Sequence, residues 1–258
     1  MSRTAHAPKP HLLVRETFRT SREMDFFNQK ELVTQTGHDI GEWPFVFVKE
    51  ALDNSTDACE DKDIPPVVEV TADAAGITVK DNGPGLPEKT LADAMNFAVR
   101  VSSREAYVSP CRGAQGNALQ TLIPMPRVLD PDAGRFVVVA HGKRHAITCG
   151  ADPITQRAVW YDDVTDCPKS KNSRAGGGKK KQPFPTGTSM RMEWAPREKE
   201  GQAVWPFDSL RVTGGEYDAK AFREQFRELV EGFALFNPHL TVRLDWFGRV
   251  TTWKATLS

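Results

Sequence analysis

The sequence predicts an α/β fold, an α+β two-layer sandwich in which helices cover one face of a mixed, mostly antiparallel sheet. Two observations support this expectation. Short runs rich in β-branched residues alternate apolar and polar positions, and longer segments have helical periodicity. Helices that pack on one side of such a sheet are typical of this class. Because neither an internal repeat nor a linker divides the chain, residues 21–258 are predicted to form one domain after an extended arm over 1–20.

Several segments have the apolar spacing of amphipathic helices. Gly37 is placed to end a helix over 24–36, and Pro44 suits the first turn of a helix over 44–61. The segment 218–236 has the longest apolar stripe, which includes Phe222 and Phe226. The predicted helices are 24–36, 44–61, 88–99 and 218–236, with another beginning within 116–123.

Alternating, β-branched runs predict the strands, and the last two are expected to form a hairpin. The predicted strands are 67–71, 77–80, 135–140, 145–149, 158–161, 188–194, 240–246 and 250–257. Two segments fit neither pattern. Residues 100–115 contain Ser, Gly and Pro without a period and predict a mobile loop, whereas 169–183 are a basic, glycine-rich insert of low complexity.

Composition excludes several classes of protein. Lys+Arg and Asp+Glu both number 34, which argues against a chain that coats nucleic acid by charge alone. No apolar run approaches a membrane span and the N-terminus lacks a signal-peptide core, so the cytoplasm is the expected location. The four cysteines have no CxxC spacing. His141 and His145 are four residues apart in a β-looking stretch, which does not bring them together as one turn of a helix would, so a metal site there is not favoured.

The segment from Glu50 to Ala58, EALDNSTDA, is the most informative in the chain. On a helix, Glu50, Asn54 and Asp57 lie on one face. A carboxylate held on a helix can orient and deprotonate a water, and an amide oxygen is a ligand that Mg²⁺ accepts. The alternatives are a solvent-facing glutamate and an asparagine at a local kink or an exposed position. The two residues together, one turn apart, favour a catalytic and metal-binding role.

A second motif, Asp81-Asn82-Gly83-Pro84-Gly85, follows a predicted strand. A carboxylate there could accept from the exocyclic amino group of adenine, and the glycines would let a flat ring approach the backbone. Taken alone, the aspartate is as well explained as a turn former. Thr188, after Gly187, is equally well interpreted as a contact near the base or as an ordinary strand residue.

A third motif is the glycine cluster from Arg112 to Ala118, RGAQGNA. Its backbone N–H groups could bind phosphates at a helix N-terminus, and Arg112 could add a charge-assisted contact. The alternative is a plain surface loop. Together the three motifs predict a site for ATP and Mg²⁺.

The motifs EALDNSTDA, DNGPG, GAQG and PTGT resemble the Bergerat-fold ATPases, the GHKL superfamily. Within it, the approach FF…KELVTQTG…WP, the helix end DNSTDACE and the run FNPH are most similar to the B subunit of DNA topoisomerase VI, over roughly residues 20–250. The resemblance implies a Bergerat fold, with residues 100–115 as the ATP lid. It also implies Glu50 as the water-activating base, Asn54 as the Mg²⁺ ligand and Asp81 as the adenine reader. The cofactor-binding candidates are Asn54, Asp57, Asp81, Gly83, Gly85, Arg112, Gly113, Gln115, Gly116, Asn117, Ala118 and Thr188.

Two departures from the family pattern matter. Ala118 stands where the family has a third lid glycine. Topoisomerase-type members take a phosphate-contacting lysine from a second, transducer-like domain, which we do not expect in this chain. A transducer-bearing partner or a cleavage subunit is therefore expected, and turnover in isolation is expected to be slow. Lys169–Lys181, with six basic and no acidic residues, suits DNA contact as well as it suits a solvated insert.

The leading hypothesis is the ATPase component of a topoisomerase VI-like, type IIB assembly that dimerises on binding ATP. The alternative is a stand-alone ATP-driven clamp or interaction module, of MutL or chaperone type, that acts through partners. A histidine kinase domain is disfavoured, because no helix presents a phospho-acceptor His with dimerisation heptads. An inactive nucleotide binder is disfavoured by the presence of Glu50.

Overall fold

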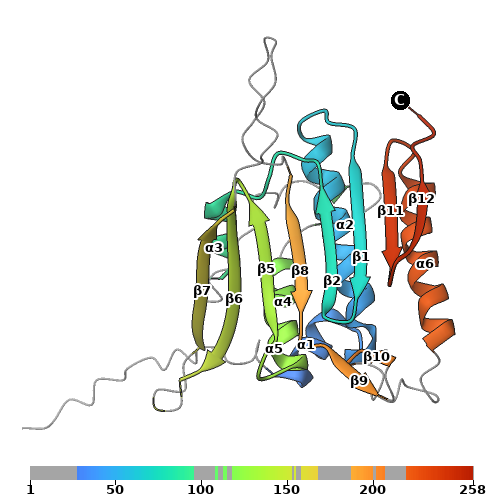
Figure 1. Cartoon of the computed structure of the whole chain (residues 1–258). Coiled ribbons are helices and arrows are strands. Elements are labelled where there is room, and N and C mark those ends of the chain that lie inside the picture. The colour runs from blue at the N-terminus through green and yellow to red at the C-terminus, as the bar shows by residue number, and fades with distance from the viewer. Residues whose placement is uncertain are drawn as a thin grey trace, which may run out of the picture.

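A single eight-stranded sheet dominates the computed structural model (Figure 1). The structure describes residues 28–95, 108–109, 113–114, 118–152, 154, 158–167, 187–199, 202–206 and 219–257. The strands of this sheet are β1 (Val67–Asp73), β2 (Gly76–Asp81), β5 (Arg135–Ala140), β6 (Lys143–Ala151), β7 (Ala158–Asp166), β8 (Ser189–Glu193), β11 (Thr241–Trp246) and β12 (Arg249–Trp253).

The strand order is β12-β11-β1-β2-β8-β5-β6-β7. Only β1 and β11 pair in parallel among these strands, and every other neighbouring pair is antiparallel. The predicted mixed, mostly antiparallel sheet is therefore confirmed. The parallel pair joins Val67 to Thr241, two positions far apart in the chain.

Helices cover one face of this sheet (Figure 1). The helices are α1 (Gln29–Thr36), the 3₁₀ turn η2 (Ile40–Glu42), α2 (Trp43–Glu60), α3 (Glu88–Ala94), α4 (Ala118–Leu122), α5 (Met125–Leu129) and α6 (Ala219–Phe236). In Figure 1, α2, α4, α5 and α6 lie behind the strands. The two-layer arrangement predicted from the sequence is thus confirmed.

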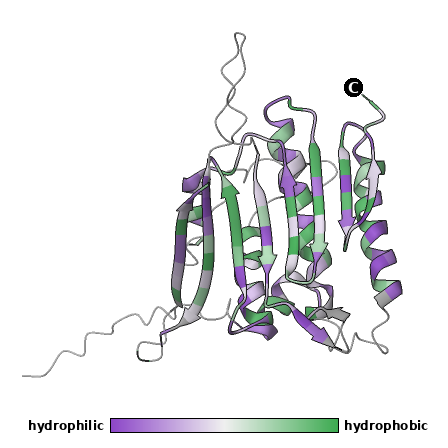
Figure 2. Ribbon diagram, in the orientation of Figure 1, coloured by the Kyte–Doolittle hydropathy of each residue, from purple (hydrophilic) through white to green (hydrophobic). Residues whose placement is uncertain are grey.

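The core lies between α2, α6 and the sheet. Phe45 of α2 packs on Phe222 of α6, with ring centroids 4.6 Å apart. On β1, buried and half-buried residues alternate, so Val68 and Val70 face the helices. Hydrophobic and hydrophilic bands alternate along α6 (Figure 2), as expected for a helix with one side on a core. Burial of this apolar surface, at about 25 cal/mol per Å², is the main stabilising contribution.

Local signals explain where two helices start and stop. Asn28 caps α1 by accepting a hydrogen bond from the Lys30 backbone N–H. Gly37 ends the same helix in the left-handed region, at φ 71°. Pro44 lies in the first turn of α2, where the missing N–H has no intrahelical partner to lose.

Several predicted boundaries differ from the structure. The first helix is described only from Gln29, and α3 ends at Ala94, so 24–27 and 96–99 lie outside the described residues. Within the predicted loop 100–115, the described residues form a two-stranded pair, β3 (Val108–Ser109) with β4 (Gly113–Ala114). The arm 1–20 and the insert 169–183 lie outside the described residues.

Besides η2, β3 and β4, three more short elements were not predicted. α5 begins beside Pro124 and Pro126, which obscure a helical pattern, but a proline in the first turn of a helix removes no intrahelical bond. The other two are the paired strands β9 (Arg197–Lys199) and β10 (Gln202–Val204). Strands of three residues are too short to give a periodic signal.

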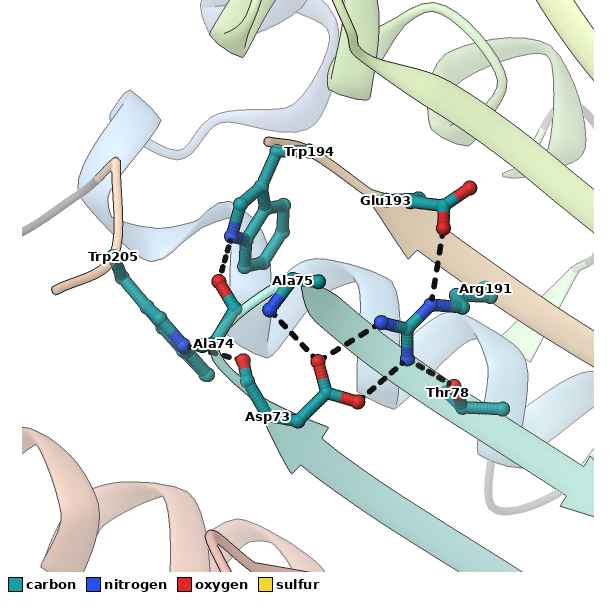
Figure 3. Close-up of polar contacts among 8 residues, drawn as sticks. All are labelled: Asp73, Ala74, Ala75, Thr78, Arg191, Glu193, Trp194 and Trp205. Atoms are coloured by element: carbon teal, nitrogen blue, oxygen red, sulfur yellow. Dashed lines mark hydrogen bonds and ion pairs between the residues drawn. The ribbon is translucent and has the colours of Figure 1, made fainter. Parts of the chain in front are cut away.

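The β1–β2 turn is fixed by a polar network at one end of the sheet (Figure 3). Arg191 of β8 forms a bidentate ion pair with Asp73, with N–O distances of 2.9 and 3.0 Å, and also donates to Thr78 Oγ1 at 2.9 Å. The indole N–H groups of Trp194 and Trp205 donate to the carbonyls of Ala74 and Asp73. These contacts tie β8 to β1 and β2.

Candidate functional site

Asp81, at the end of β2, is the centre of the candidate site. Its side chain is 5% exposed. Oδ1 accepts from the backbone N–H groups of Gly83 (2.8 Å) and Thr188 (3.0 Å), and Oδ2 accepts from Ser55 Oγ (3.1 Å). An ionised carboxylate has about four acceptor positions, so one on Oδ2 remains after these three bonds.

The electrostatics of Asp81 follow from its burial. Burial disfavours the charged carboxylate and raises its pKa, while the hydrogen bonds from Thr188, Gly83 and Ser55 act in the opposite direction without cancelling the effect. A buried carboxyl group with a raised pKa and unused acceptor capacity is typical of a binding site.

Two glycines let the chain fold closely around this carboxylate. Gly187 has φ 99°, and a Cβ there would lie 1.9 Å from the Asp81 backbone oxygen. A Cβ on Gly83 would lie 3.0 Å from Asp81 Oδ1. The Asp81 N–H also donates to the Thr188 carbonyl at 2.9 Å. Gly187 therefore cannot carry a side chain without strain, and a Cβ on Gly83 would crowd the carboxylate oxygen.

Gly85 meets a residue from another hairpin. Its φ is 93°, and a Cβ there would lie 2.9 Å from the imidazole ring of His141, in the β5–β6 turn. Lys143 of the same hairpin pairs with Glu88 at 2.7 Å. The turn after Asp81 is therefore supported by β5 and β6 as well as by β8.

α2 packs directly behind this turn. Ser55 is 1% exposed and supplies the hydroxyl that reaches Asp81. Asn82 accepts from the Val67 N–H and donates to the Pro65 carbonyl, which fixes the turn to the start of β1. Ser55 lies in the segment EALDNSTDA but was not among the predicted site residues. The signal that could have identified its role was a hydroxyl among otherwise apolar positions.

The remaining α2 candidates lie on the same helix. Glu50 and Asn54 are half-buried and one turn apart, whereas Asp57 is 3% exposed. Glu50 lies five residues before Ser55, which is about 7.5 Å along a helix axis. Among the described residues, no group of three or more His, Cys, Asp or Glu could hold a metal ion. The assignment of Asn54 as a metal ligand stays a prediction.

Lys49 is a charged neighbour of Glu50 that the sequence interpretation missed. Its Nζ lies 2.7 Å from Glu50 Oε1 and 3.1 Å from Asp53 Oδ2. Residues i and i+1 of a helix do not normally face each other, so spacing gives little warning of the contact with Glu50.

Most of the predicted phosphate loop lies outside the described residues. Arg112, Gln115, Gly116 and Asn117 lie outside the described residues. Gly113 belongs to the short strand β4, and Ala118 is the first residue of α4. Their role in phosphate binding stays a prediction.

His141 and His145 make different contacts. His145 is buried and its Nδ1 contacts Asp162 Oδ2 at 2.7 Å, between β6 and β7. His141 lies against Gly85.

Within the described part of the chain, no helix is long and apolar enough to cross a membrane.

No protein-family model matches the chain. Curated proteins match parts of its sequence. The B subunit of type 2 DNA topoisomerase 6 from Thermococcus kodakarensis is 33% identical over 96 residues, which is 35% of this chain and 17% of the relative. The same protein from Thermococcus sibiricus is 30% identical over 155 residues, or 57% of this chain and 24% of the relative. The chain thus matches no more than about a quarter of these relatives' length.

Among solved structures, the Aquifex aeolicus MutL ATPase domain complexed with ADP superposes with a TM-score of 0.43 at 17% identity. The match covers 83% of this chain and 64% of that one. The N-terminal domain of a DNA repair protein gives 0.41 at 18% identity, over 80% and 50% of the two chains. These are distant likenesses, and the sheet order described above defines the fold without them.

The resemblance of this chain to the GHKL ATPases, through the B subunit of topoisomerase 6, is confirmed over the segment that these relatives share.

Proposed function

We propose that this chain binds ATP with Mg²⁺ and hydrolyses it, as the ATPase component of a topoisomerase VI-like assembly. One observation carries the proposal. The buried Asp81 carboxylate is held by three donors from three segments and keeps acceptor capacity on Oδ2. Adenine presents an exocyclic amino group that this oxygen could accept from, and guanine has a carbonyl oxygen at the same position.

The hydrolytic part of the proposal rests on α2. Glu50 is half-buried on a rigid helix, where a carboxylate can take a proton from a water attacking the terminal phosphorus. As the new P–O bond forms, the bond to the β-phosphate oxygen breaks, and the proton held by Glu50 later passes to solvent or phosphate. ADP and phosphate are the products.

Asn54 fits a site for Mg²⁺ that takes most of its oxygens from phosphates and water, because one protein amide oxygen is then enough. Its half-buried position on α2, one turn after Glu50, supports this assignment. When bound, the ion would neutralise charge that develops on the phosphate oxygens. Residues Asn54 and Glu50 would then orient the phosphate and the water on the same helix face.

The assembly part of the proposal rests on the relatives, which are named as topoisomerase 6 subunits. We include ATP-driven dimerisation and a partner chain that completes the phosphate site. DNA contact through Lys169–Lys181 belongs to the same proposal, since these residues carry six positive charges.

The test is ATP binding by calorimetry and phosphate release with Mg²⁺, for the wild type and for Glu50→Ala. Glu60→Ala is a matched control, because it changes an exposed glutamate on the same helix. We expect binding in all three proteins and turnover in the wild type and the control only. Failure of the wild type to bind ATP would refute the proposal. DNA and a cleavage subunit are then added, and a rise in turnover supports the assembly.

A further inference from the structure

Three charged side chains form a connected group on the N-terminal half of α2. Lys49 Nζ contacts Glu50 Oε1 at 2.7 Å and Asp53 Oδ2 at 3.1 Å. The three side chains differ in exposure: Lys49 is 48% exposed, Glu50 28% and Asp53 8%. The lysine therefore joins a buried carboxylate to the half-buried carboxylate proposed as the base.

The contact with Asp53 is the ordinary one for a helix, because residues i and i+4 are neighbours on its surface. The contact with Glu50 is not, because consecutive residues point about 100° apart around the axis. The Lys49 and Glu50 side chains must therefore lean toward each other to make this contact. Asp53 binds the same ammonium group.

The charge of Lys49 is stable in this setting. Burial of the ammonium lowers its pKa, but hydrogen bonds and attraction from Glu50 and Asp53 outweigh burial, and the net pKa is raised. Lys49 is thus a cation over the range in which enzymes work. Its contact with Glu50 occupies one carboxylate oxygen, which leaves Oε2 for a water.

The arrangement in which Asp53 binds Lys49 and Lys49 binds Glu50 resembles the way enzymes orient a general base. A general base works best when a third group fixes its orientation, as the base in a catalytic triad is fixed by its own partner. A long glutamate side chain on a helix surface otherwise samples several rotamers. A displacement of about 1 Å at the reacting groups can cost about a hundredfold in rate.

We propose that Lys49, fixed by Asp53, is a positioning residue that holds the Glu50 carboxylate with Oε2 directed at the attacking water. This proposal rests on the ATPase function proposed above. Lys49 itself does not touch the substrate. Its effect is on the rate of the chemical step, whereas an ion pair of this exposure adds little to folding stability.

The test compares Lys49→Met, Lys49→Arg and a control, Lys62→Met, which removes an exposed lysine beyond the end of α2. We expect Lys49→Met to lower kcat by about ten- to a hundredfold with KM for ATP within twofold, since the binding contacts are untouched. Arginine can pair with both carboxylates, so Lys49→Arg should restore most of kcat. Lys62→Met should behave as the wild type.

Loss of fold is controlled with the double variant Lys49→Met/Asp53→Asn, which leaves no buried carboxylate facing an absent cation. It should have the melting temperature of the wild type within a few degrees and the low kcat of Lys49→Met. An unchanged or increased kcat in either variant overturns the positioning role.

A second measurement separates this proposal from the function itself. The carboxyl-carbon NMR resonance of Glu50, assigned with Glu50→Gln, should move in Lys49→Met and stay in place in Lys62→Met. If the wild type hydrolyses no ATP, the proposed function fails and the positioning role fails with it. If the wild type hydrolyses ATP and Lys49→Met has the same kcat, only the positioning role of Lys49 is refuted.

Discussion

Replacing Asp81 by asparagine should separate the structural role of this side chain from its ligand role. In Asp81→Asn, the amide oxygen can occupy the Oδ1 position and keep accepting from Gly83 and Thr188. The amide nitrogen then takes the place of Oδ2. Ser55 can accept from it, because a hydroxyl serves as donor or acceptor. The atom at the Oδ2 position, which is proposed to accept from adenine in the wild type, is then a donor.

The magnitudes follow from these contacts. Asp81→Asn keeps three hydrogen bonds and relieves the burial of a charge, so its free energy of unfolding should change by about 1 kcal/mol or less. Nucleotide affinity should fall by about 2–3 kcal/mol, or roughly 30- to 150-fold in Kd, because two donors now face each other. Asp81→Ala instead leaves two buried N–H groups without an acceptor, which costs about 2–6 kcal/mol of stability.

Isothermal titration with an ATP analogue and urea unfolding measure both quantities on the same three proteins. The reasoning is refuted if Asp81→Asn binds ATP as tightly as the wild type. It is also refuted if Asp81→Asn is as unstable as Asp81→Ala, because the carboxylate charge would then be essential to the fold.

The raised pKa of Asp81 adds a dependence on pH. As pH falls through that pKa, the carboxyl gains a proton and loses an acceptor, so ATP affinity should fall at a higher pH than for an ordinary aspartate. Stability changes in the opposite direction. Because the folded state holds this proton more tightly than the unfolded state, the contribution of Asp81 to stability decreases as pH rises from its ordinary value through the raised one. Asp81→Asn should show neither effect.

Substitutions at three glycines and at Arg191 have clear expectations for stability. Gly187→Ala should destabilise by about 3 kcal/mol or more, through its φ of 99° and the 1.9 Å clash. In urea unfolding, Gly248→Ala, where only φ is unfavourable, should cost about 1–2 kcal/mol, and Gly150→Ala, which meets nothing within 4 Å, should be close to neutral. Arg191→Met should cost about 1 kcal/mol, because Asp73 is 45% exposed. Burial raises the pKa of Asp73, but hydrogen bonds from Arg191 and the Ala75 N–H outweigh burial, and the net pKa is lowered. The stability that the ionised Asp73 contributes is therefore present above the ordinary aspartate pKa and is lost as pH falls through the lowered pKa. If acid destabilised Arg191→Met as much as the wild type, this assignment would be contradicted.

The fold could be predicted wherever a periodic pattern was long enough to identify an element. α2 and α6 were found within a residue or two, because each has an apolar stripe of several turns. The β6–β7 hairpin is longer than predicted. Its strands reach Ala151 and Asp166, and residues 161–166 are exposed, so they lack an alternating pattern. The parallel pairing of β1 with β11 had no local signal at all.

The candidate site could be predicted in part for the same reason. Asp81 follows a strand and precedes glycines, and both facts are visible in the chain. Ser55 and Lys49 were missed because their roles depend on partners that spacing does not reveal. Ser55 contacts a residue on β2, and the Lys49 side chain leans toward its neighbour Glu50. Tertiary contacts and side-chain direction, rather than residue type, decide such roles.

The register of the sheet links the two ends of β2. Along β2 and β8, Gly76 pairs with Glu193 and Lys80 with Ser189, which brings Asp81 opposite Thr188. A slip of one residue would turn every side chain to the other face. The Arg191–Asp73 ion pair adds a side-chain contact to this register near the β1–β2 turn, where Asp73 lies about 17 Å from Asp81 by strand rise. The polar network in Figure 3 therefore supports, together with the β2–β8 backbone ladder, the register in which the Thr188 N–H meets the Asp81 carboxylate.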